Sequence, residues 1–378
     1  MLPWASMEVT PMGTYRPCCL YNESIPNMSV HNSNTVADAQ HSDYMKNLRK
    51  QFLAGEKPNG CNACWQEESV PGRMSKRKAT FTKLKEVNID YTESSVAPIF
   101  LDLKLGNICN LKCRICGSWS SSKWAQEEID IANGDNQLAL DQLKKGQWPR
   151  RIPSWWESLE DALEHIEYLE FTGGEPFLIN EHFDLLQVLV DKGYSKKIDI
   201  HYNTNGTVWP VRGVDLWKQF KRVEIAFSID DVGKRFEYQR YGADWGKTND
   251  VIQQATKSNF DLQICTTFNI QNSYYWGELS QWIASTSITD VHFNILQEPP
   301  QFCLRNLPER IKPIFANKMI TESDRSWQQK AMQITQFMHL PGIDMSKEFV
   351  NKIEQHDKYR NEKFEDAHPE VWRLLSGL

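Results

Sequence analysis

The chain of 378 residues lacks any long apolar run. No stretch of roughly 18 apolar residues occurs and no charged-then-apolar leader opens the sequence, so we predict neither a membrane span nor a signal peptide. An excess of positive charge is also lacking, since 43 Lys and Arg residues stand against 49 Asp and Glu residues. The resulting net charge of -6 at pH 7 argues against a generally basic nucleic-acid-binding protein. Hydrophobic residues make up 40% and charged residues 24%, as in soluble globular proteins. We therefore expect no membrane and no nucleic acid among its partners.

Nine cysteines are present, and several are grouped at metal-binding spacings. An odd number grouped in this way suits a reducing, cytoplasmic environment better than a disulfide framework. Cys109, Cys113 and Cys116 fall within eight residues, and three such thiolates can hold three irons of one cubane while the fourth iron has no protein ligand. The alternative is a zinc knuckle or a set of buried thiols. Zinc prefers four ligands, usually as two pairs, and no partner pair lies close in the sequence.

The cysteine triplet follows a predicted strand. Residues 101–105 alternate apolar and polar side chains, as in a half-buried strand. A second strand pattern over residues 166–171 leads into Gly173, Gly174, Glu175 and Pro176. Two glycines let the backbone approach a ligand closely, and a carboxylate can accept a bond from an ammonium group.

Further strand patterns alternate with helical patterns along the chain. One helix is predicted over residues 180–192, and Gly193 ends it. This alternation predicts an α/β fold of parallel βα units. The remaining strands are predicted over residues 197–203, 223–229, 262–270 and 290–296.

The cysteine triplet, followed at the next strand end by Gly-Gly-Glu-Pro, resembles the signature of the radical S-adenosylmethionine (radical SAM) superfamily. The resemblance implies a 4Fe-4S cluster whose open iron chelates S-adenosylmethionine, and a one-electron reductant such as flavodoxin or ferredoxin. Reductive cleavage would yield a 5'-deoxyadenosyl radical that abstracts hydrogen from a substrate. The six βα units resemble the partial (β/α)6 TIM-like barrel of the superfamily, with its active site at the carboxyl ends of the strands.

The resemblance also implies residue roles. Cys109, Cys113 and Cys116 would carry the catalytic cluster, and Gly173 to Pro176 would hold the methionine portion. Asn205 and Asp230, two further candidates, lie in Asn-Gly and Asp-Asp segments, which are common in ordinary turns; a turn role is therefore the alternative for them. The nucleoside or carboxylate would be lined by Asn205, Ser228 and Asp230, with Ile115 near the adenine.

A second cysteine set lies near the N-terminus: Cys18, Cys19, Cys61 and Cys64. Zinc and an iron-sulfur cluster both suit this set. Adjacent side chains rarely point the same way, so we expect that Cys18 and Cys19 do not both ligate one cluster. The set resembles the twitch and SPASM auxiliary-cluster domains, here placed ahead of the barrel, and this implies a second iron-sulfur cluster. Its fourth ligand stays open among Cys19, Cys303, a substrate atom and a residue upstream of the first methionine.

The predicted organisation has four parts. Residues 1–72 form the small N-terminal cysteine-ligated cluster domain, 73–97 a linker, 98–300 the barrel, and 301–378 a helical C-terminal extension. Single helices are predicted over residues 154–165, 326–339 and 347–362.

Three other features are given structural interpretations. A basic run is expected to be a solvated linker or helix face, with docking of an acidic peptide, a carrier or a phosphate-bearing substrate as the alternative. Five tryptophans in the first βα connection are expected to pack, although they would otherwise wall a substrate channel. Cys265 is predicted to be a buried small hydrophobe, and Cys303 to pack, although it could reach the open end of the barrel. The basic run comprises Arg73, Lys76, Arg77, Lys78, Lys83 and Lys85, and the tryptophans are Trp119, Trp124, Trp148, Trp155 and Trp156.

We expect a radical SAM enzyme that modifies a peptide or protein side chain, because the resembled family includes peptide-modifying enzymes. Radical dehydrogenation or epimerisation of a small sugar or amino-sugar is the alternative substrate class. A non-catalytic iron-sulfur or zinc-binding module is the alternative of a different kind.

Overall fold

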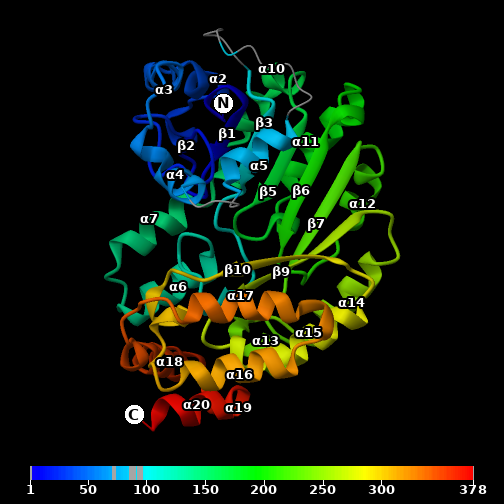
Figure 1. Cartoon of the computed structure of the whole chain (residues 1–378). Helices are drawn as coiled ribbons and strands as arrows, with labels where there is room; N and C mark the ends of the chain where they lie inside the picture. Colours follow the sequence, from blue (N-terminus) through cyan, green and yellow to red (C-terminus); the bar gives the residue numbers. More distant parts are fainter. Residues whose placement is uncertain (1, 70–73, 85–90, 92–96, 378) are drawn as a thin grey trace.

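A computed structural model describes residues 2–69, 74–84, 91 and 97–377. Eight strands form one open sheet in the order β10-β9-β7-β6-β5-β3-β1-β2, in which only the β1–β2 pair is antiparallel (Figure 1). The six strands predicted for the barrel are confirmed. They are β3 (Phe100–Lys104), β5 (Tyr168–Thr172), β6 (Asp199–Thr204), β7 (Arg222–Ser228), β9 (Asp261–Phe268) and β10 (Asp290–Ile295).

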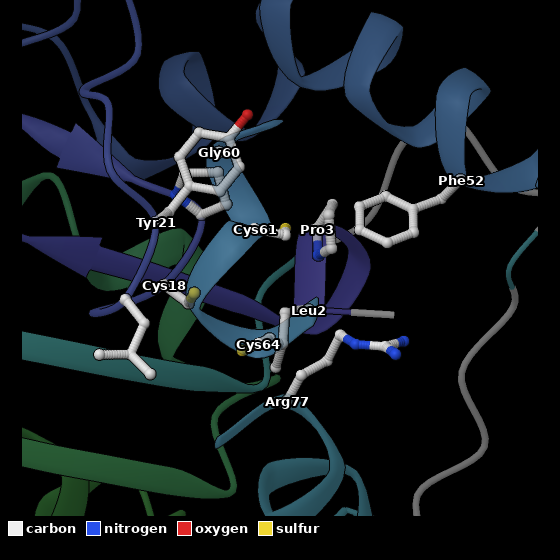
Figure 2. Close-up of a pocket in the computed structure, with 11 residues that line it drawn as sticks. Leu2, Pro3, Cys18, Tyr21, Phe52, Gly60, Cys61, Cys64 and Arg77 are labelled. Carbon is white, nitrogen blue, oxygen red and sulfur yellow. The ribbon is translucent and has the colours of Figure 1, made fainter. Parts of the chain in front are cut away.

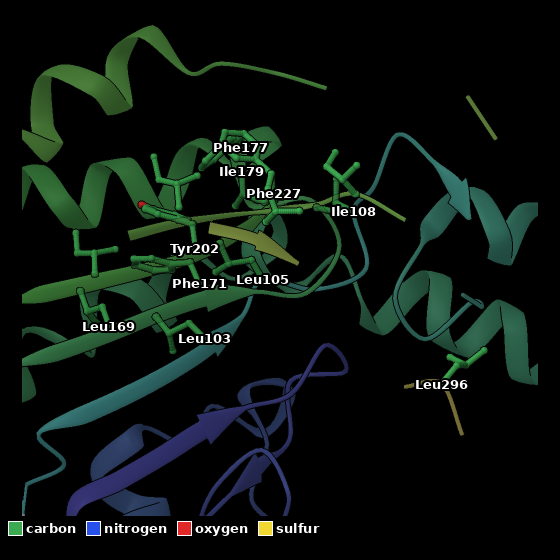
Figure 3. Packing of buried hydrophobic residues seen from close by; sticks show 14 of the residues in the cluster. Leu103, Leu105, Ile108, Leu169, Phe171, Phe177, Ile179, Tyr202, Phe227 and Leu296 are labelled. Atoms are coloured by element: carbon green, nitrogen blue, oxygen red, sulfur yellow. The ribbon is translucent and has the colours of Figure 1, made fainter. Parts of the chain in front are cut away.

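Helices cover one face of this sheet, because alternate strand residues on that face are apolar. The predicted helix over residues 180–192 is confirmed as α11 (Asn180–Asp191). Figure 3 shows Leu103, Phe171 and Tyr202 on the sheet together with Phe177 and Ile179, and all five are buried. The other crossover helices are α12 (Val211–Trp217), α13 (Gly233–Gln239), α14 (Trp245–Ala255) and α15 (Trp276–Ser285).

The first connection is long and helical, and the single helix predicted over residues 154–165 is wrong. The chain forms α9 (Pro153–Glu157) and α10 (Glu160–Leu163) instead. Trp155 and Trp156 both pack against Trp148, with ring centroids 4.7 and 5.9 Å away, and the Ser158 hydroxyl donates to the Trp155 carbonyl where α9 ends. Packing is confirmed for Trp124, Trp148 and Trp155, whereas Trp119 is 49% exposed. The connection also contains α6 (Ser122–Ile131), α7 (Gln137–Lys145) and α8 (Trp148–Arg151).

The N-terminal segment joins the main sheet. β1 (Ser6–Val9) pairs in parallel with β3, and β2 (Tyr15–Arg16) pairs with β1 at the sheet edge. The Trp155 indole donates to the Tyr15 hydroxyl at 2.7 Å, so this segment shares the core of the barrel. Its helices are α1 (Leu2–Ala5), α2 (Val36–His41), α3 (Asp43–Leu53), α4 (Asn62–Glu68) and α5 (Lys76–Lys83).

The C-terminal extension is helical, as predicted. Figure 1 shows its helices gathered at the end of the molecule near β9, β10 and α13. In the described part of the chain, no helix has the length and apolar character needed to cross a membrane. The extension comprises α16 (Lys312–Glu322), α17 (Gln328–Met338), α18 (Ser346–Arg360), α19 (Phe364–Ala367) and α20 (Pro369–Ser376).

Candidate active site

The cysteine triplet lies on the loop that leaves β3. A two-stranded ribbon orders this loop, because β4 (Lys112–Cys113) pairs with β8 (Arg240–Tyr241) and sets Cys113 opposite Arg240. The Cys116 amide donates to the Cys113 carbonyl at 2.9 Å and closes the turn. All three thiols are half-buried. Burial raises the pKa of Cys116 to about 12, and burial together with the neighbouring thiol of Cys113 raises the pKa of Cys109.

Donors surround these sulfur atoms. The Leu111 amide lies 3.4 Å from Cys109 Sγ, Asn205 Nδ2 lies 3.9 Å from the same atom, and Arg240 Nη1 lies 3.9 Å from Cys113 Sγ. Donors of this kind stabilise thiolates, so the site fits an anionic iron-sulfur cluster. Among the described residues, no three His, Cys, Asp or Glu side chains lie close enough to share one metal ion. Cubane ligands bind separate irons and therefore stand further apart than ligands of one ion.

The two glycines at the end of β5 bring two loops together. The Gly174 amide donates to the Gly106 carbonyl at 3.0 Å, and the Glu175 amide donates to the Ile108 carbonyl at 2.8 Å. A Cβ atom on Gly174 would lie 2.2 Å from the Ile108 carbonyl oxygen, and Gly173 has a φ of +107°. The close approach seen here is therefore to the backbone before the cysteines, whereas the sequence interpretation assigned it to a ligand.

The Glu175 carboxylate is 1% exposed and already holds three donors. Its Oε1 accepts from the Phe177 amide at 3.1 Å and the Thr204 hydroxyl at 2.8 Å, and its Oε2 accepts from the Asn205 amide at 2.7 Å. Burial raises the pKa of Glu175 to about 7, while the three donors act in the opposite direction. Because a carboxylate offers about four acceptor positions, one position on Oε2 remains for a ligand donor.

The predicted nucleoside residues have different surroundings. The Asn205 amide nitrogen donates to Asn110 at 2.9 Å, and its oxygen accepts from the Thr207 hydroxyl at 2.6 Å, so this side chain orders the loop beside Cys109. Ser228 lines the cavity on the concave face of the sheet. Ile115 is half-buried and packs against the core. Pro176 is buried in the turn after Glu175.

Asp230 is buried and acts through a residue that the sequence did not single out. Its Oδ2 accepts from Arg240 Nη2 at 2.6 Å, and its Oδ1 accepts from the Thr267 amide at 2.8 Å. Arg240 is 9% exposed and lines the cavity, and among the described residues its buried Nε has no hydrogen-bond partner. The guanidinium thus brings positive charge to the cavity wall beside the cysteine loop. No sequence motif marks Arg240, because the residues that it contacts lie on other segments of the chain.

A polar cavity of about 360 Å³ occupies the concave face of the sheet. The interior of a full barrel is filled by branched apolar side chains. Here the inward positions are polar, so the interior stays open. Cys265 is half-buried and lines this cavity, so its prediction as a buried hydrophobe is wrong. Strand residues that line the cavity are Tyr168, Glu170, His201, Asn203, Glu224, Ser228, Arg240, Gln263, Cys265, Thr267, His292 and Asn294.

Helix α5 lies over one part of this cavity and lends it two lysines. Lys76 Nζ lies 3.4 Å from Glu170 Oε2, and Lys83 donates to the Tyr168 hydroxyl at 3.0 Å. Arg77 pairs with Glu68 and stacks on Trp65. The predicted solvated face is therefore wrong for Lys76 and Arg77, although Lys78 is exposed. Arg73 and Lys85 lie outside the described residues.

Residues 103–272 match the family model of the radical SAM superfamily. This stretch is a radical SAM domain. The expected enzyme class is thereby confirmed, and such a domain implies a 4Fe-4S cluster and S-adenosylmethionine. The match contains the cysteine triplet, the Gly-Gly-Glu-Pro turn and Arg240. It does not extend to residues 1–72, so the auxiliary cluster domain stays a prediction.

Solved structures of radical SAM proteins resemble parts of the chain. anSMEcpe with bound AdoMet is 18% identical with a TM-score of 0.41, over 62% of this chain and 61% of that one. Streptococcus suis SuiB bound to S-adenosylmethionine is 13% identical with a TM-score of 0.38, over 86% of this chain and 68% of that one. The chain thus spans about three fifths of the length of anSMEcpe. A search among curated proteins gives no match.

Beside the radical SAM domain, three of the four N-terminal cysteines come together. Figure 2 shows Cys18, Cys61 and Cys64 around one pocket that Arg77 also lines. Burial and the neighbouring thiols raise the pKa of Cys18 to about 12 and that of Cys61 to about 11. Cys19 does not line this pocket; burial raises its pKa to about 12, and the charged groups that act on that pKa are Asp102, Lys76, Cys18 and Lys104. Cys303 is fully buried beyond β10, in agreement with the packing role.

Proposed function

We propose that this radical SAM enzyme modifies a substrate held in the polar cavity, and that the substrate is a peptide or protein side chain. One observation carries the proposal: three half-buried thiols lie on one loop of the radical SAM domain, and the buried Arg240, which also lines the polar cavity, lies beside them. The reduced cluster, when bound with S-adenosylmethionine, supplies a 5'-deoxyadenosyl radical that takes a hydrogen atom from the substrate.

The residues around the loop would bind and orient the cofactor. Cys109, Cys113 and Cys116 would hold three irons, and the Arg240 guanidinium would attract the cofactor's carboxylate. Asp230 keeps the Arg240 side chain in place. The free acceptor position on Glu175 Oε2 would receive the ammonium group, as the family resemblance implies. Asn205 and Ser228 remain candidates for the nucleoside side.

Two further cofactor assignments belong to this proposal. Cys18, Cys61 and Cys64 would anchor an auxiliary iron-sulfur cluster, and Cys19 would not be its ligand. The electron for cofactor cleavage would come from a flavodoxin or a ferredoxin. Support for the auxiliary site is the shared pocket of three thiols and the resemblance to twitch and SPASM domains.

A small sugar or amino-sugar is the second candidate substrate. It is favoured by the side chains that line the cavity, because amides and hydroxyls of Asn203, Gln263, Thr267 and Asn294 can donate to and accept from several hydroxyl groups.

Deuterium transfer tests the proposed function. The reconstituted enzyme is given S-adenosylmethionine, a strong reductant, and either the peptide or the small-metabolite fraction of cells grown in deuterated medium. We expect deuterium from the peptide fraction to appear in 5'-deoxyadenosine, measured by mass spectrometry. Label from the metabolite fraction alone would replace the peptide assignment by the sugar assignment, and label from neither fraction would contradict both.

A further inference from the structure

Helix α5 lies against β5 and places two lysines on the wall of the polar cavity (Figure 1). Lys76 and Lys83 are the first and last residues of α5, close to two helical turns apart, so both project from the same side of the helix. Lys76 Nζ lies 3.4 Å from Glu170 Oε2, and Lys83 Nζ donates to the Tyr168 hydroxyl at 3.0 Å. Because α5 lies outside residues 103–272, these two cations are not part of the radical SAM domain.

Both carboxylates on the cavity wall already have partners. Glu170 pairs with Lys76. Glu224 Oε1 lies 2.6 Å from His201 Nδ1, and its Oε2 pairs with Arg222 at 2.9 Å. The hydrogen bond with His201 is the largest cause that lowers the pKa of Glu224 to about 2. The two acidic side chains are therefore compensated within the protein, and they present little net negative charge to a bound ligand.

Lys83 is the cation of the cavity wall that lacks such compensation. The Arg240 guanidinium is held by Asp230 at 2.6 Å. Lys83 has the neutral Tyr168 hydroxyl instead, and among the described residues no carboxylate lies within ion-pairing distance of its Nζ. An ammonium group has three donors, so two of them remain for a ligand. Lys83 is exposed, so a ligand can reach it.

Lys83 lies at the end of the cavity away from the cysteine loop. Its partner Tyr168 opens β5 and stands opposite Phe100, the first residue of β3. The cysteine loop follows the other end of this strand. Since β3 spans Phe100–Lys104 and a strand rises about 3.3 Å per residue, about 13 Å separate the two ends. A substrate that contacts Lys83 and reacts near the cysteine loop must extend over a similar length.

We propose that the cavity binds a substrate with an anionic group, a carboxylate or a phosphate, which pairs with Lys83 at the end of the cavity away from the cysteine loop. The inference rests on the proposed function, since it names the chemistry of the substrate in the same cavity. An acidic peptide and a sugar phosphate both supply such a group. The anionic group anchors the substrate and is not the group that reacts, so Lys83 determines specificity and takes no part in the chemical step.

Removal of the anionic group tests the inference. The full-length reconstituted enzyme, with S-adenosylmethionine and a strong reductant, receives the deuterated cell fraction that labels 5'-deoxyadenosine. This fraction is untreated, amidated at its carboxylates with methylamine, or treated with a phosphatase. We expect one of the two treatments to lower the label transferred by the wild type by about 10-fold or more, because a charge-assisted hydrogen bond is lost. The treatment that does so identifies the anion as a carboxylate or as a phosphate.

A lysine variant tests the residue. Lys83→Met should raise the amount of untreated fraction needed for half-maximal labelling by about 10-fold or more. The effective treatment should then remove little further label from this variant, because the contact is already lost. Lys83→Arg should recover part of the wild-type behaviour. Lys78→Met, which changes an exposed lysine of the same helix, is the matched control and should behave as the wild type. Circular dichroism and iron content establish that each variant is folded and loaded.

The outcomes separate this inference from the proposed function. Wild-type labelling that survives both treatments would overturn the anionic group while the proposed function stands. Equal shifts in the Lys78 and Lys83 variants would overturn the assignment of Lys83, as would a loss on treatment as large in Lys83→Met as in the wild type. Absence of label in the wild type with every fraction would overturn the proposed function and this inference with it.

Discussion

Cys18 and Cys19 are adjacent in the chain but have separate surroundings. Cys18 shares a pocket with Cys61 and Cys64, whereas Cys19 does not line that pocket, and Asp102, Lys76 and Lys104 act on its pKa along with Cys18. This difference agrees with the sequence argument that neighbouring side chains diverge. At the scale of single residues, the spacing of cysteines is therefore most informative when combined with the direction of each side chain.

We predict that only one of the two neighbours holds metal. Cys18→Ala should lower iron and sulfide by about one cluster per chain, as should Cys61→Ala, because each removes an anchoring thiolate. Cys19→Ala is the matched control and should keep the wild-type content. Iron and sulfide analysis of the reconstituted proteins measures the effect. Equal losses in the Cys18 and Cys19 variants would contradict the assignment.

The site residues differ in how far the sequence predicts them. Cys109, Cys113 and Cys116 are predictable because all three lie on one loop. Arg240 is not, because the carboxylate that holds its guanidinium belongs to Asp230, which lies beyond β7 on another segment of the chain. Glu175 was identified, but the donors that occupy most of its carboxylate depend on how two loops fold together.

Strands and helices also differ in how far the sequence predicts them. The barrel strands are predictable because several residues alternate in each. β1 has four residues, too few for a period, and its pairing with β3 depends on contacts across about 90 residues of chain. The break between α9 and α10 depends on Trp148, which lies outside both helices.

Helix α18 contacts the cysteine loop through a buried arginine. Arg360 Nε lies 3.1 Å from Glu127 Oε2, and Nη1 donates to the Lys112 carbonyl at 2.9 Å, one residue before Cys113. Its guanidinium also stacks on Trp124 and Tyr241. The C-terminal extension therefore supports the shape of the loop.

Two further contacts reinforce this support. Arg114, directly after Cys113, pairs with Asp357 at 2.9 Å and with Glu362 at 2.6 Å. The Tyr238 hydroxyl donates to Asp357 at 2.6 Å. Since Lys112 and Arg114 flank Cys113, the extension holds the loop on both sides of this ligand.

We predict that Arg360→Met destabilises the protein by about 3 to 5 kcal/mol, because it leaves the buried Glu127 with one cation fewer. It should also lower iron retention at the cysteine triplet and alter the electron paramagnetic resonance signal of that cluster. Arg360→Lys should recover part of both. Arg373→Met, an exposed arginine on α20, is the control. Wild-type iron retention and signal in a folded Arg360→Met protein would contradict the proposed support.

At the scale of the whole molecule, the residues that line the cavity come from several segments: Arg240 lies 3.9 Å from Cys113 Sγ, and Lys76 comes from helix α5, whose Arg77 lines the N-terminal cysteine pocket. The triplet follows the carboxyl end of β3, and the charges of Asp102 and Lys104 on the same strand act on the pKa of Cys19. Strands β1 and β2 connect the N-terminal segment to the barrel sheet, and α18 connects the extension to the triplet loop. Both segments outside the radical SAM domain thus contact elements that shape the site.

Cleavage of S-adenosylmethionine tests the central claim, that Cys109, Cys113 and Cys116 hold a cluster with an open iron. The anaerobically reconstituted wild type, given a strong reductant, should release 5'-deoxyadenosine, detected by chromatography. Cys113→Ala should release none, because it removes one of the three ligands. Cys265→Ala, which changes a cavity cysteine outside the triplet, should still release the nucleoside. Equal release by Cys113→Ala and the wild type would contradict the account.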